Sequence, residues 1–189
     1  MLDLAAINSN WTLFLDRDGV LNIEKIDDYI YHRGEFRLYE NTLEALAILQ
    51  PVFGHSVLVT NQRGVEKGLM TEEALLDIHR HLQEQLAGHG IKPLDGIYYN
   101  TSLLNDHPDR KPQTGMALRA QADFPDICFS KSLMVGNNLS DMFFGRNAGM
   151  HTVFVKTTKP GIALPHPAID LAFNDLLNFA LALRAARNR

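Results

Sequence analysis

Residues 11–22 read W-T-L-F-L-D-R-D-G-V-L-N, and they carry the strongest structural signal in the chain. The first five, Trp11–Leu15, form an almost continuous apolar run, which is typical of a strand covered on both faces. The run stops at Asp16, Asp18 follows two positions later, and Gly19 permits a tight exit from the strand. Two carboxylates at a strand end are suited to hold a cation and to present a nucleophile. An ordinary acidic turn fits a bare D-x-D-G equally well, so the rest of the sequence has to decide.

The composition indicates a globular protein of ordinary size. The chain has 189 residues, of which 46% are hydrophobic, and this fits a single domain over residues 1–189 with a well-filled core. A formal net charge of −4 gives no reason to expect a surface for nucleic acid or membrane. Cys128 is the only cysteine, which excludes an intrachain disulfide and a cysteine-rich zinc site, and we expect it to be a small core residue.

The same view of the chain predicts where the protein resides. Met1–Asn10 lacks the basic stretch and apolar core of a secretory signal. No apolar run approaches the ~20 residues that span a bilayer. We therefore expect a soluble, cytoplasmic protein.

Short apolar runs alternate with amphipathic segments along the chain. The runs predict strands at residues 11–15, 56–60, 95–100, 132–136 and 151–156, and a short sixth strand at 169–173. The amphipathic segments predict helices that begin near residues 41, 71, 114 and 174. Asn41 is expected to cap the first of these in a capping box with Glu44, and Asn174 to cap the last. Strands that alternate with helices predict right-handed crossovers and a mostly parallel sheet in an α/β fold.

Polar residues of complementary chemistry follow four of the predicted strands. They are Asp16 with Asp18, then Thr60, then Lys111, and finally Asn137 with Asp141. In an open parallel sheet, ligands bind beyond the carboxyl ends of the strands, near the point where the strand order reverses. We therefore expect these residues to converge on one edge of the sheet and to form one site.

Phosphoryl transfer is the chemistry that these residue types fit best. Asp16 can attack phosphorus to form an aspartyl-phosphate, and its carboxylate can provide one oxygen ligand to Mg²⁺. Asp18 can protonate the leaving alkoxide and then activate the water that hydrolyses the intermediate. Thr60 offers a hydroxyl and a backbone N–H to a phosphoryl oxygen, and Lys111 can balance the developing negative charge. A receiver-type phosphoacceptor also uses Asp, Thr and Lys around magnesium, but it would not need Asp18 as an acid/base.

Two arginines extend this site toward a substrate. Arg63 and Arg110 could hold a second anionic group bidentately. The leading hypothesis is therefore a magnesium-dependent phosphomonoesterase whose partner is a small-molecule phosphate ester, such as a sugar phosphate or bisphosphate. The sequence leaves the oligomeric state open.

Four segments, in this order, closely resemble the motifs of the haloacid dehalogenase (HAD) superfamily. They read F-L-D-R-D-G-V-L-N from Phe14, V-T-N-Q-R-G from Val59, R-K-P-Q-T-G-M from Arg110 and V-G-N-N-L-S-D from Val135. The D-R-D-G and T-N-Q forms more narrowly resemble the D-glycero-D-manno-heptose 1,7-bisphosphate phosphatase and histidinol-phosphate phosphatase group. The resemblance covers residues 11–160 approximately. It implies a three-layer, Rossmann-like (HAD-like) fold with a central, mostly parallel sheet and no separate cap domain.

The resemblance also implies roles for individual residues. Asp16 would be the nucleophile and Asp18 the acid/base, while Thr60 and Lys111 would form the phosphate-binding pair. The implied ligands of Mg²⁺ are the Asp16 carboxylate, the Asp18 backbone carbonyl and the residue at position 137. Further positions match residues that contact substrate in the group: Asn61, Arg63 and Arg110.

Two departures from the group's pattern shape the expectations. The bisphosphate phosphatases usually carry a zinc loop of cysteines and a histidine before the third motif, whereas Asn100–Asp109 contains no cysteine, so no zinc is expected. Asn137 stands where the group has a metal-binding aspartate, which predicts weaker metal binding, partly offset by Asp141 in or near the coordination sphere. The alternatives that remain are a histidinol-phosphate phosphatase and a catalytically weak relative that binds a phosphorylated ligand.

Overall fold

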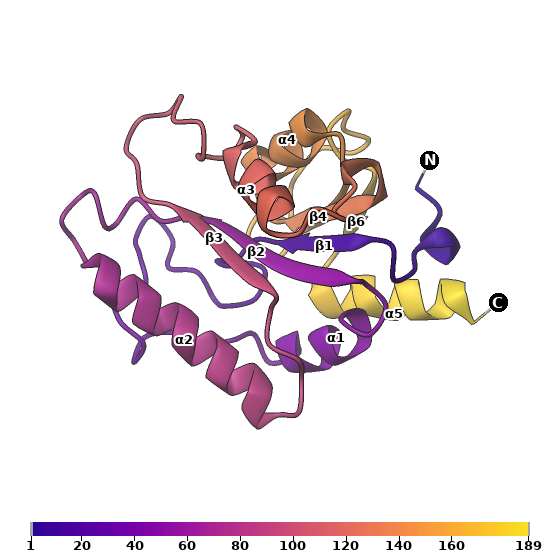
Figure 1. The fold of residues 1–189 in the computed structure, drawn as a ribbon, viewed down its shortest axis with the longest axis horizontal. Helices are drawn as coiled ribbons and strands as arrows, with labels where there is room; N and C mark the ends of the chain where they lie inside the picture. The colour runs from indigo at the N-terminus through magenta and orange to yellow at the C-terminus, as the bar shows by residue number, and fades with distance from the viewer. Residues whose placement is uncertain (1, 189) are drawn as a thin grey trace.

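A six-stranded sheet forms the centre of the computed structural model, which describes residues 2–188 (Figure 1). Every strand pair is parallel, and the strands lie in the order β3-β2-β1-β4-β5-β6. The strands are β1 (Thr12–Leu15), β2 (His55–Asn61), β3 (Gly96–Asn100), β4 (Ser132–Gly136), β5 (His151–Val155) and β6 (Leu171–Phe173). The predicted parallel sheet is confirmed, and the predicted strand positions agree apart from residues at the ends.

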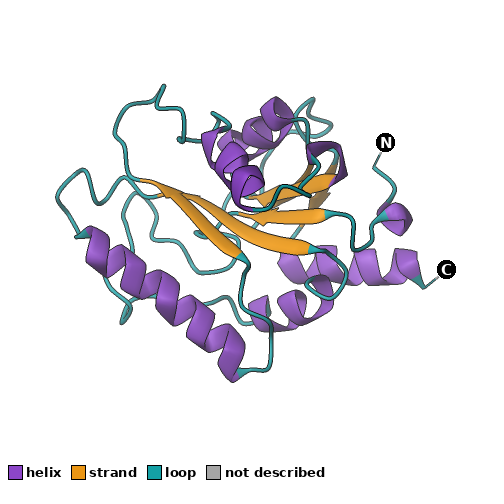
Figure 2. Ribbon diagram, in the orientation of Figure 1, coloured by secondary structure: helices purple, strands orange, loops and turns teal. Residues whose placement is uncertain are grey.

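Helices cover both faces of this sheet, which makes three layers (Figure 2). They are α1 (Thr42–Leu49), α2 (Glu72–Gly88), α3 (Gly115–Asp123), α4 (Leu139–Ala148) and α5 (Leu176–Arg187), with two 3-10 turns at Leu4–Ala6 and Phe129–Lys131. Helices α1, α2 and α5 lie on one face, and α3 and α4 lie on the other (Figure 1). The chain moves outward from β1 to β3 and then returns to β4 on the other side of β1, so right-handed crossovers place the helices on opposite faces.

Alternating side chains of the buried strands supply two separate hydrophobic cores. Leu13 and Leu15 of β1 pack with α1, α2 and α5, whereas Phe14 between them packs with α3 and α4. All three side chains are fully buried. The continuous apolar run therefore reflects a strand that is covered on both faces, as expected for a parallel sheet.

Three local predictions were wrong. Asn41 precedes α1 but its side chain makes no capping hydrogen bond, because its backbone (φ −99°, ψ 5°) lies outside the extended region that N-capping requires. Asp175, not Asn174, caps α5 by accepting a hydrogen bond from the backbone N–H of Asn178. Cys128 is exposed and does not belong to the core.

The topology brings the ends of four strands to one edge. In β1, Leu15 lies in register with Leu58 of β2 on one side and with Val135 of β4 on the other. The chain leaves the sheet just beyond these residues, and the strand order changes direction between β1 and β4. This is the position at which an α/β sheet opens a crevice for a ligand.

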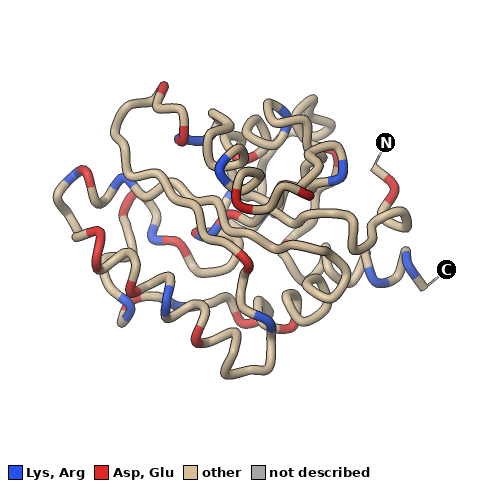
Figure 3. The backbone as a smooth tube through the Cα atoms, viewed as in Figure 1, with Lys and Arg blue, Asp and Glu red and all other residues tan. Residues whose placement is uncertain are grey.

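Charged residues of both signs are distributed over the fold. Acidic and basic residues are interspersed along the chain (Figure 3). Within residues 2–188, none of the helices combines the length and the apolar character needed to cross a membrane.

Candidate active site

Every site residue predicted from the sequence lines one cavity of about 240 Å³ beyond the carboxyl ends of the strands. The predicted residues in its wall are Asp16, Asp18, Thr60, Asn61, Arg63, Arg110, Lys111, Asn137 and Asp141. Four further residues line it and were given no individual role by the sequence: Glu24, Tyr29, Asn138 and Ser140. Segments roughly 120 positions apart along the chain thus contribute to one cavity, because parallel strands end at the same edge of the sheet.

Lys111 lies at the centre of the floor of this cavity. Its Nζ is 2.7 Å from Asp16 Oδ1, 2.7 Å from Asp141 Oδ1 and 2.9 Å from the Val59 carbonyl oxygen. The side chain is 2% exposed, so all three partners act on it in a medium that screens charge poorly. Burial works to lower the pKa of Lys111, but the carboxylates of Asp141 and Asp16 outweigh it and hold the pKa above its ordinary value. The ammonium is therefore retained, and its donors are directed at Asp16, Asp141 and the Val59 carbonyl oxygen.

The surroundings of Asp16 are electrostatically unbalanced. Burial, followed by the nearby Asp141 carboxylate, raises the pKa of Asp16 well above its ordinary value, although Lys111 opposes this. Two buried carboxylates share one ammonium, which leaves excess negative charge at the cavity floor. A cation bound near Asp16 would relieve this excess.

Asp18, in contrast to Asp16, is surrounded by groups that stabilise its negative charge. Arg17 holds both of its oxygens, through contacts of 3.0 Å to Oδ2 and 3.1 Å to Oδ1, and Asn22 Nδ2 donates to Oδ1 at 2.9 Å. Burial works to raise the pKa of Asp18, but Arg17 first, and then hydrogen bonds from Asn22 and Gln62, hold it below its ordinary value. Asp18 is therefore a carboxylate, which is the form that a general base requires.

Gln62 connects Asp18, Thr60 and Arg17, a role that was not predicted from the sequence. Its Nε2 lies 2.7 Å from Asp18 Oδ2 and 2.8 Å from Thr60 Oγ1, while its Oε1 accepts from Arg17 at 3.0 Å. The amide is 1% exposed at the residue level, so it orients the three groups without solvent. The T-N-Q form of the second motif was the sequence signal that could have identified it.

Arg17 continues this network into the protein interior. The residue is fully buried, and its Nη1 lies 3.1 Å from Nε2 of His79 on α2. An arginine only donates hydrogen bonds, so Nε2 of His79 must be the acceptor and the imidazole must be neutral. Burial, followed by the positive charge of Arg17, lowers the pKa of His79 to about 3. Neither residue was predicted to belong to the site. An arginine between two aspartates, such as Arg17, is ordinarily expected to be exposed to solvent.

Asp141 is engaged by the protein on both carboxylate oxygens. Oδ1 contacts Lys111, and Oδ2 accepts from the backbone N–H of Asn138 at 3.0 Å in a capping box at the start of α4. This arrangement favours a role in holding Lys111 in place. It disfavours direct contact with a metal ion.

Asn137 is buried in the wall of the same cavity. Its Nδ2 donates to Thr158 Oγ1 at 2.7 Å and to Glu24 Oε2 at 3.3 Å. Gly19, which has a φ of +81°, leaves the space for these contacts, since a Cβ there would lie 1.9 Å from Nδ2. The glycine of the first motif is thus required by the approach of Asn137 as well as by the turn.

The two arginines lie in the cavity wall with part of their hydrogen-bonding capacity unused. Arg63 Nη2 donates to Asn105 at 2.8 Å and to the Leu103 carbonyl oxygen. Arg110 Nη1 is buried and has no partner among the described residues. Burial, followed by repulsion from Arg63, lowers the pKa of Arg110 from its ordinary value. Two guanidinium groups in one cavity wall are chemically suited to bind an anion.

The side chain of Asn61 lines the cavity and is hydrogen-bonded to the backbone of Lys111. Its Oδ1 accepts from the Lys111 backbone N–H at 3.1 Å, and its Nδ2 donates to the Lys111 carbonyl oxygen at 3.2 Å. This pair of bonds ties the end of β2 to the third motif. The geometry assigns Asn61 a positioning contact with Lys111.

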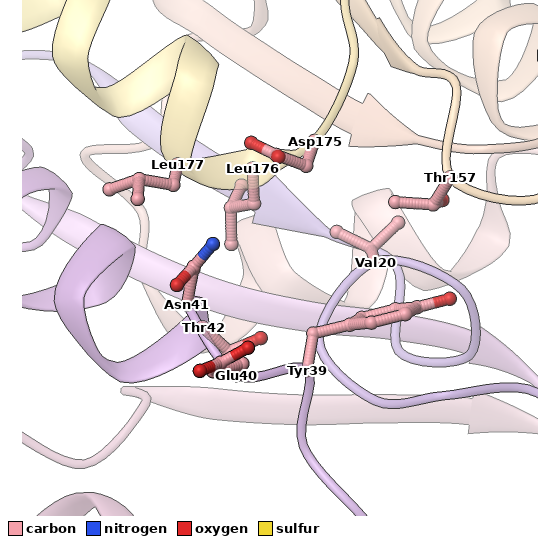
Figure 4. Close-up of a pocket in the computed structure, with 9 residues that line it drawn as sticks. All are labelled: Val20, Tyr39, Glu40, Asn41, Thr42, Thr157, Asp175, Leu176 and Leu177. Atoms are coloured by element: carbon pink, nitrogen blue, oxygen red, sulfur yellow. The ribbon is translucent and has the colours of Figure 1, made fainter.

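A second cavity of about 230 Å³ lies beside the segment that follows the first motif (Figure 4). It lies between residues 39–42 and the start of α5, and Val20 and Thr157 also line it. None of the predicted site residues is part of its wall. The chemistry described above belongs to the first cavity.

Comparisons with known proteins agree with this geometry. A sequence profile described as HAD-hydrolase-like matches residues 109–177. The chain is 35% identical to a D-glycero-α-D-manno-heptose-1,7-bisphosphate 7-phosphatase of Mycobacterium tuberculosis (strain CDC 1551 / Oshkosh), over 94% of this chain and 93% of that protein. It is 34% identical to a D-glycero-β-D-manno-heptose-1,7-bisphosphate 7-phosphatase of Photorhabdus laumondii, over 93% of this chain and 96% of that protein.

A solved structure has the same fold. A D,D-heptose 1,7-bisphosphate phosphatase from B. bronchiseptica, complexed with magnesium and phosphate, superposes with a TM-score of 0.81 and 27% identity, covering 93% of this chain and 98% of that one. Fold and site together define a hydrolase of the phosphatase class. The chain belongs to the HAD-like family, among relatives that are heptose-bisphosphate phosphatases. The resemblance seen in the four motifs is confirmed.

Proposed function

We propose that the protein is a magnesium-dependent phosphomonoesterase that removes the 7-phosphate of a D-glycero-D-manno-heptose 1,7-bisphosphate through an aspartyl-phosphate on Asp16. The observation that carries the choice of a bisphosphate is the pair of arginines, Arg63 and Arg110, in the wall of the same cavity as Asp16 and Lys111. A second phosphate on the substrate would meet these guanidinium groups. Relatives named for the α and the β anomer are similar to this chain at 35% and 34% identity, so the proposal covers both.

The site residues support a two-step displacement. An Asp16 oxygen attacks phosphorus, the bond from phosphorus to the sugar oxygen breaks, and the alkoxide takes a proton from Asp18. Water then attacks the aspartyl-phosphate, Asp18 takes its proton, and inorganic phosphate leaves as the Asp16 carboxylate is restored. Asp18 is already the base needed in the second step, and the negative charge of a bound phosphate favours its protonated form in the first. Lys111 and Thr60 hold the nonbridging oxygens.

The donor set fits Mg²⁺, which prefers one or two carboxylates together with substrate phosphate oxygens and water. Asp16, the Asp18 backbone carbonyl and Oδ1 of Asn137 would hold it, at the side of the cavity where negative charge is in excess. When bound, the ion neutralises charge on the phosphoryl group and orients it.

A phosphate-release assay on the purified protein tests the proposal. With Mg²⁺, we expect turnover of a heptose 1,7-bisphosphate to the 1-phosphate, identified by ³¹P NMR, and loss of turnover in Asp16→Asn. Histidinol phosphate serves as the competing substrate, and its cationic amine should be disfavoured beside Arg63 and Arg110. Preferred turnover of histidinol phosphate, or equal turnover by Asp16→Asn, would contradict the proposal.

A further inference from the structure

The amide of Asn137 is held in one orientation by two acceptors. Thr158 Oγ1 and Glu24 Oε2 both lie within hydrogen-bond distance of the same atom, Nδ2. A carboxylate cannot donate a hydrogen bond, so the atom that faces Glu24 must be the amide nitrogen. The amide oxygen, Oδ1, is then the atom left to face the cavity. Reversing the amide would set its oxygen against a carboxylate oxygen and leave Glu24 without this donor.

Glu24 also brings negative charge to this wall of the cavity. It is half-buried and lines the same cavity as Asp16 and Asn137. Within residues 2–188, its carboxylate forms no ion pair with a lysine, arginine or histidine, whereas the acidic groups of Asp16 and Asp141 share Lys111. An uncompensated carboxylate next to a neutral amide is what a cation at that amide oxygen would require.

The geometry assigns Glu24 the role of supporting cation binding at Asn137, by fixing the amide with its oxygen toward the site and by supplying the negative charge that the amide lacks. This inference rests on the metal dependence in the proposed function. Glu24 would be a positioning residue, and it lies in the segment that follows the first motif, 113 positions away from Asn137.

Cation binding without substrate provides the test. Mn²⁺ is the probe, and its dissociation constant is measured by electron paramagnetic resonance on the full chain. We expect Glu24→Gln to weaken Mn²⁺ binding about tenfold, the lower end of the range for residues that support metal ligands. Glu40→Gln is the matched control, because Glu40 is exposed, lies on the same loop and lines the second cavity, and this variant loses the same charge. It should bind Mn²⁺ like the wild type.

The same Glu24→Gln change in an Asn137→Asp protein distinguishes an effect on the Asn137 amide from a general effect of charge. In Asn137→Asp, the introduced carboxylate supplies its own charge and meets Glu24 Oε2 as a like charge, so adding Glu24→Gln should weaken Mn²⁺ binding by less than about threefold. Circular dichroism melting of each variant without metal checks that the fold is intact.

The possible outcomes have different meanings. Unchanged Mn²⁺ affinity in Glu24→Gln, or an equal loss in both backgrounds, would overturn the inference and leave the proposed function standing. No Mn²⁺ binding by the wild-type protein would overturn the metal dependence of the proposed function itself.

Discussion

His79 makes the stability of the protein depend on pH in a way that the structure defines. The residue is 4% exposed, Nε2 accepts from Arg17 at 3.1 Å, and Nδ1 is buried with no partner within residues 2–188. Protonation would place a second positive charge against the Arg17 guanidinium. The ordinary pKa of 6.5 therefore falls to about 3 in the folded protein, through burial first and Arg17 second.

The sign and size of the effect follow from proton linkage. The unfolded chain takes up a proton near its pKa of 6.5, whereas the folded chain stays neutral until about 3. The contribution of neutral His79 to the free energy of unfolding is therefore fully present above the unfolded pKa of 6.5 and is lost as the pH falls below that value. Between about pH 8 and pH 5, this one group should lower the free energy of unfolding by about 2 kcal/mol.

Replacing the imidazole by an amide removes this contribution. His79→Gln keeps an acceptor for Arg17 but cannot be protonated, so its loss of stability over the same pH range should be smaller than that of the wild type by about 2 kcal/mol. Urea unfolding of the metal-free protein at the two pH values measures the difference. Equal losses in the wild type and His79→Gln would refute a neutral, buried imidazole in the folded state.

Other predictions concern the cavity itself. Lys111→Met leaves the buried carboxylates of Asp16 and Asp141 without their cation, so it should abolish phosphate release and lower the urea-derived stability at neutral pH by about 3–5 kcal/mol. Arg110→Ala should raise KM for a sugar bisphosphate about 10-fold or more while changing KM for p-nitrophenyl phosphate little, because only the bisphosphate has a second anionic group. Gln62→Leu removes the donor shared by Asp18 and Thr60, so steady-state kinetics should show kcat reduced about 100-fold.

Each of these changes has an informative contrary result. Wild-type stability in Lys111→Met would mean that the two carboxylates are not buried together as charges. An equal effect of Arg110→Ala on both substrates would place the arginine at the reacting phosphate. An unchanged kcat in Gln62→Leu would mean that Arg17 and Asn22 suffice to hold Asp18.

The local sequence determined the fold class and most of the cavity wall. Short apolar runs that alternate with amphipathic helices favour a buried parallel sheet, and the polar residues at the ends of these runs then meet at one edge. That is why Asp16, Thr60, Lys111 and Asn137 could be brought together before any coordinates. Such signals lie within a few residues of each other, where hydrophobic periodicity and chain direction act.

The tertiary structure alone decided how those residues are held. Arg17 meets His79 across 62 positions, and Asn137 meets Glu24 across 113, so neither partner is marked in its own segment. The helix caps at Asn41 and Asn174 failed for a related reason, since the backbone angles that make a cap are set by packing as well as by residue type. Charges and amides find partners through space, and only the folded chain determines which carboxylate is balanced, which amide oxygen is free and which arginine has a donor left for a ligand.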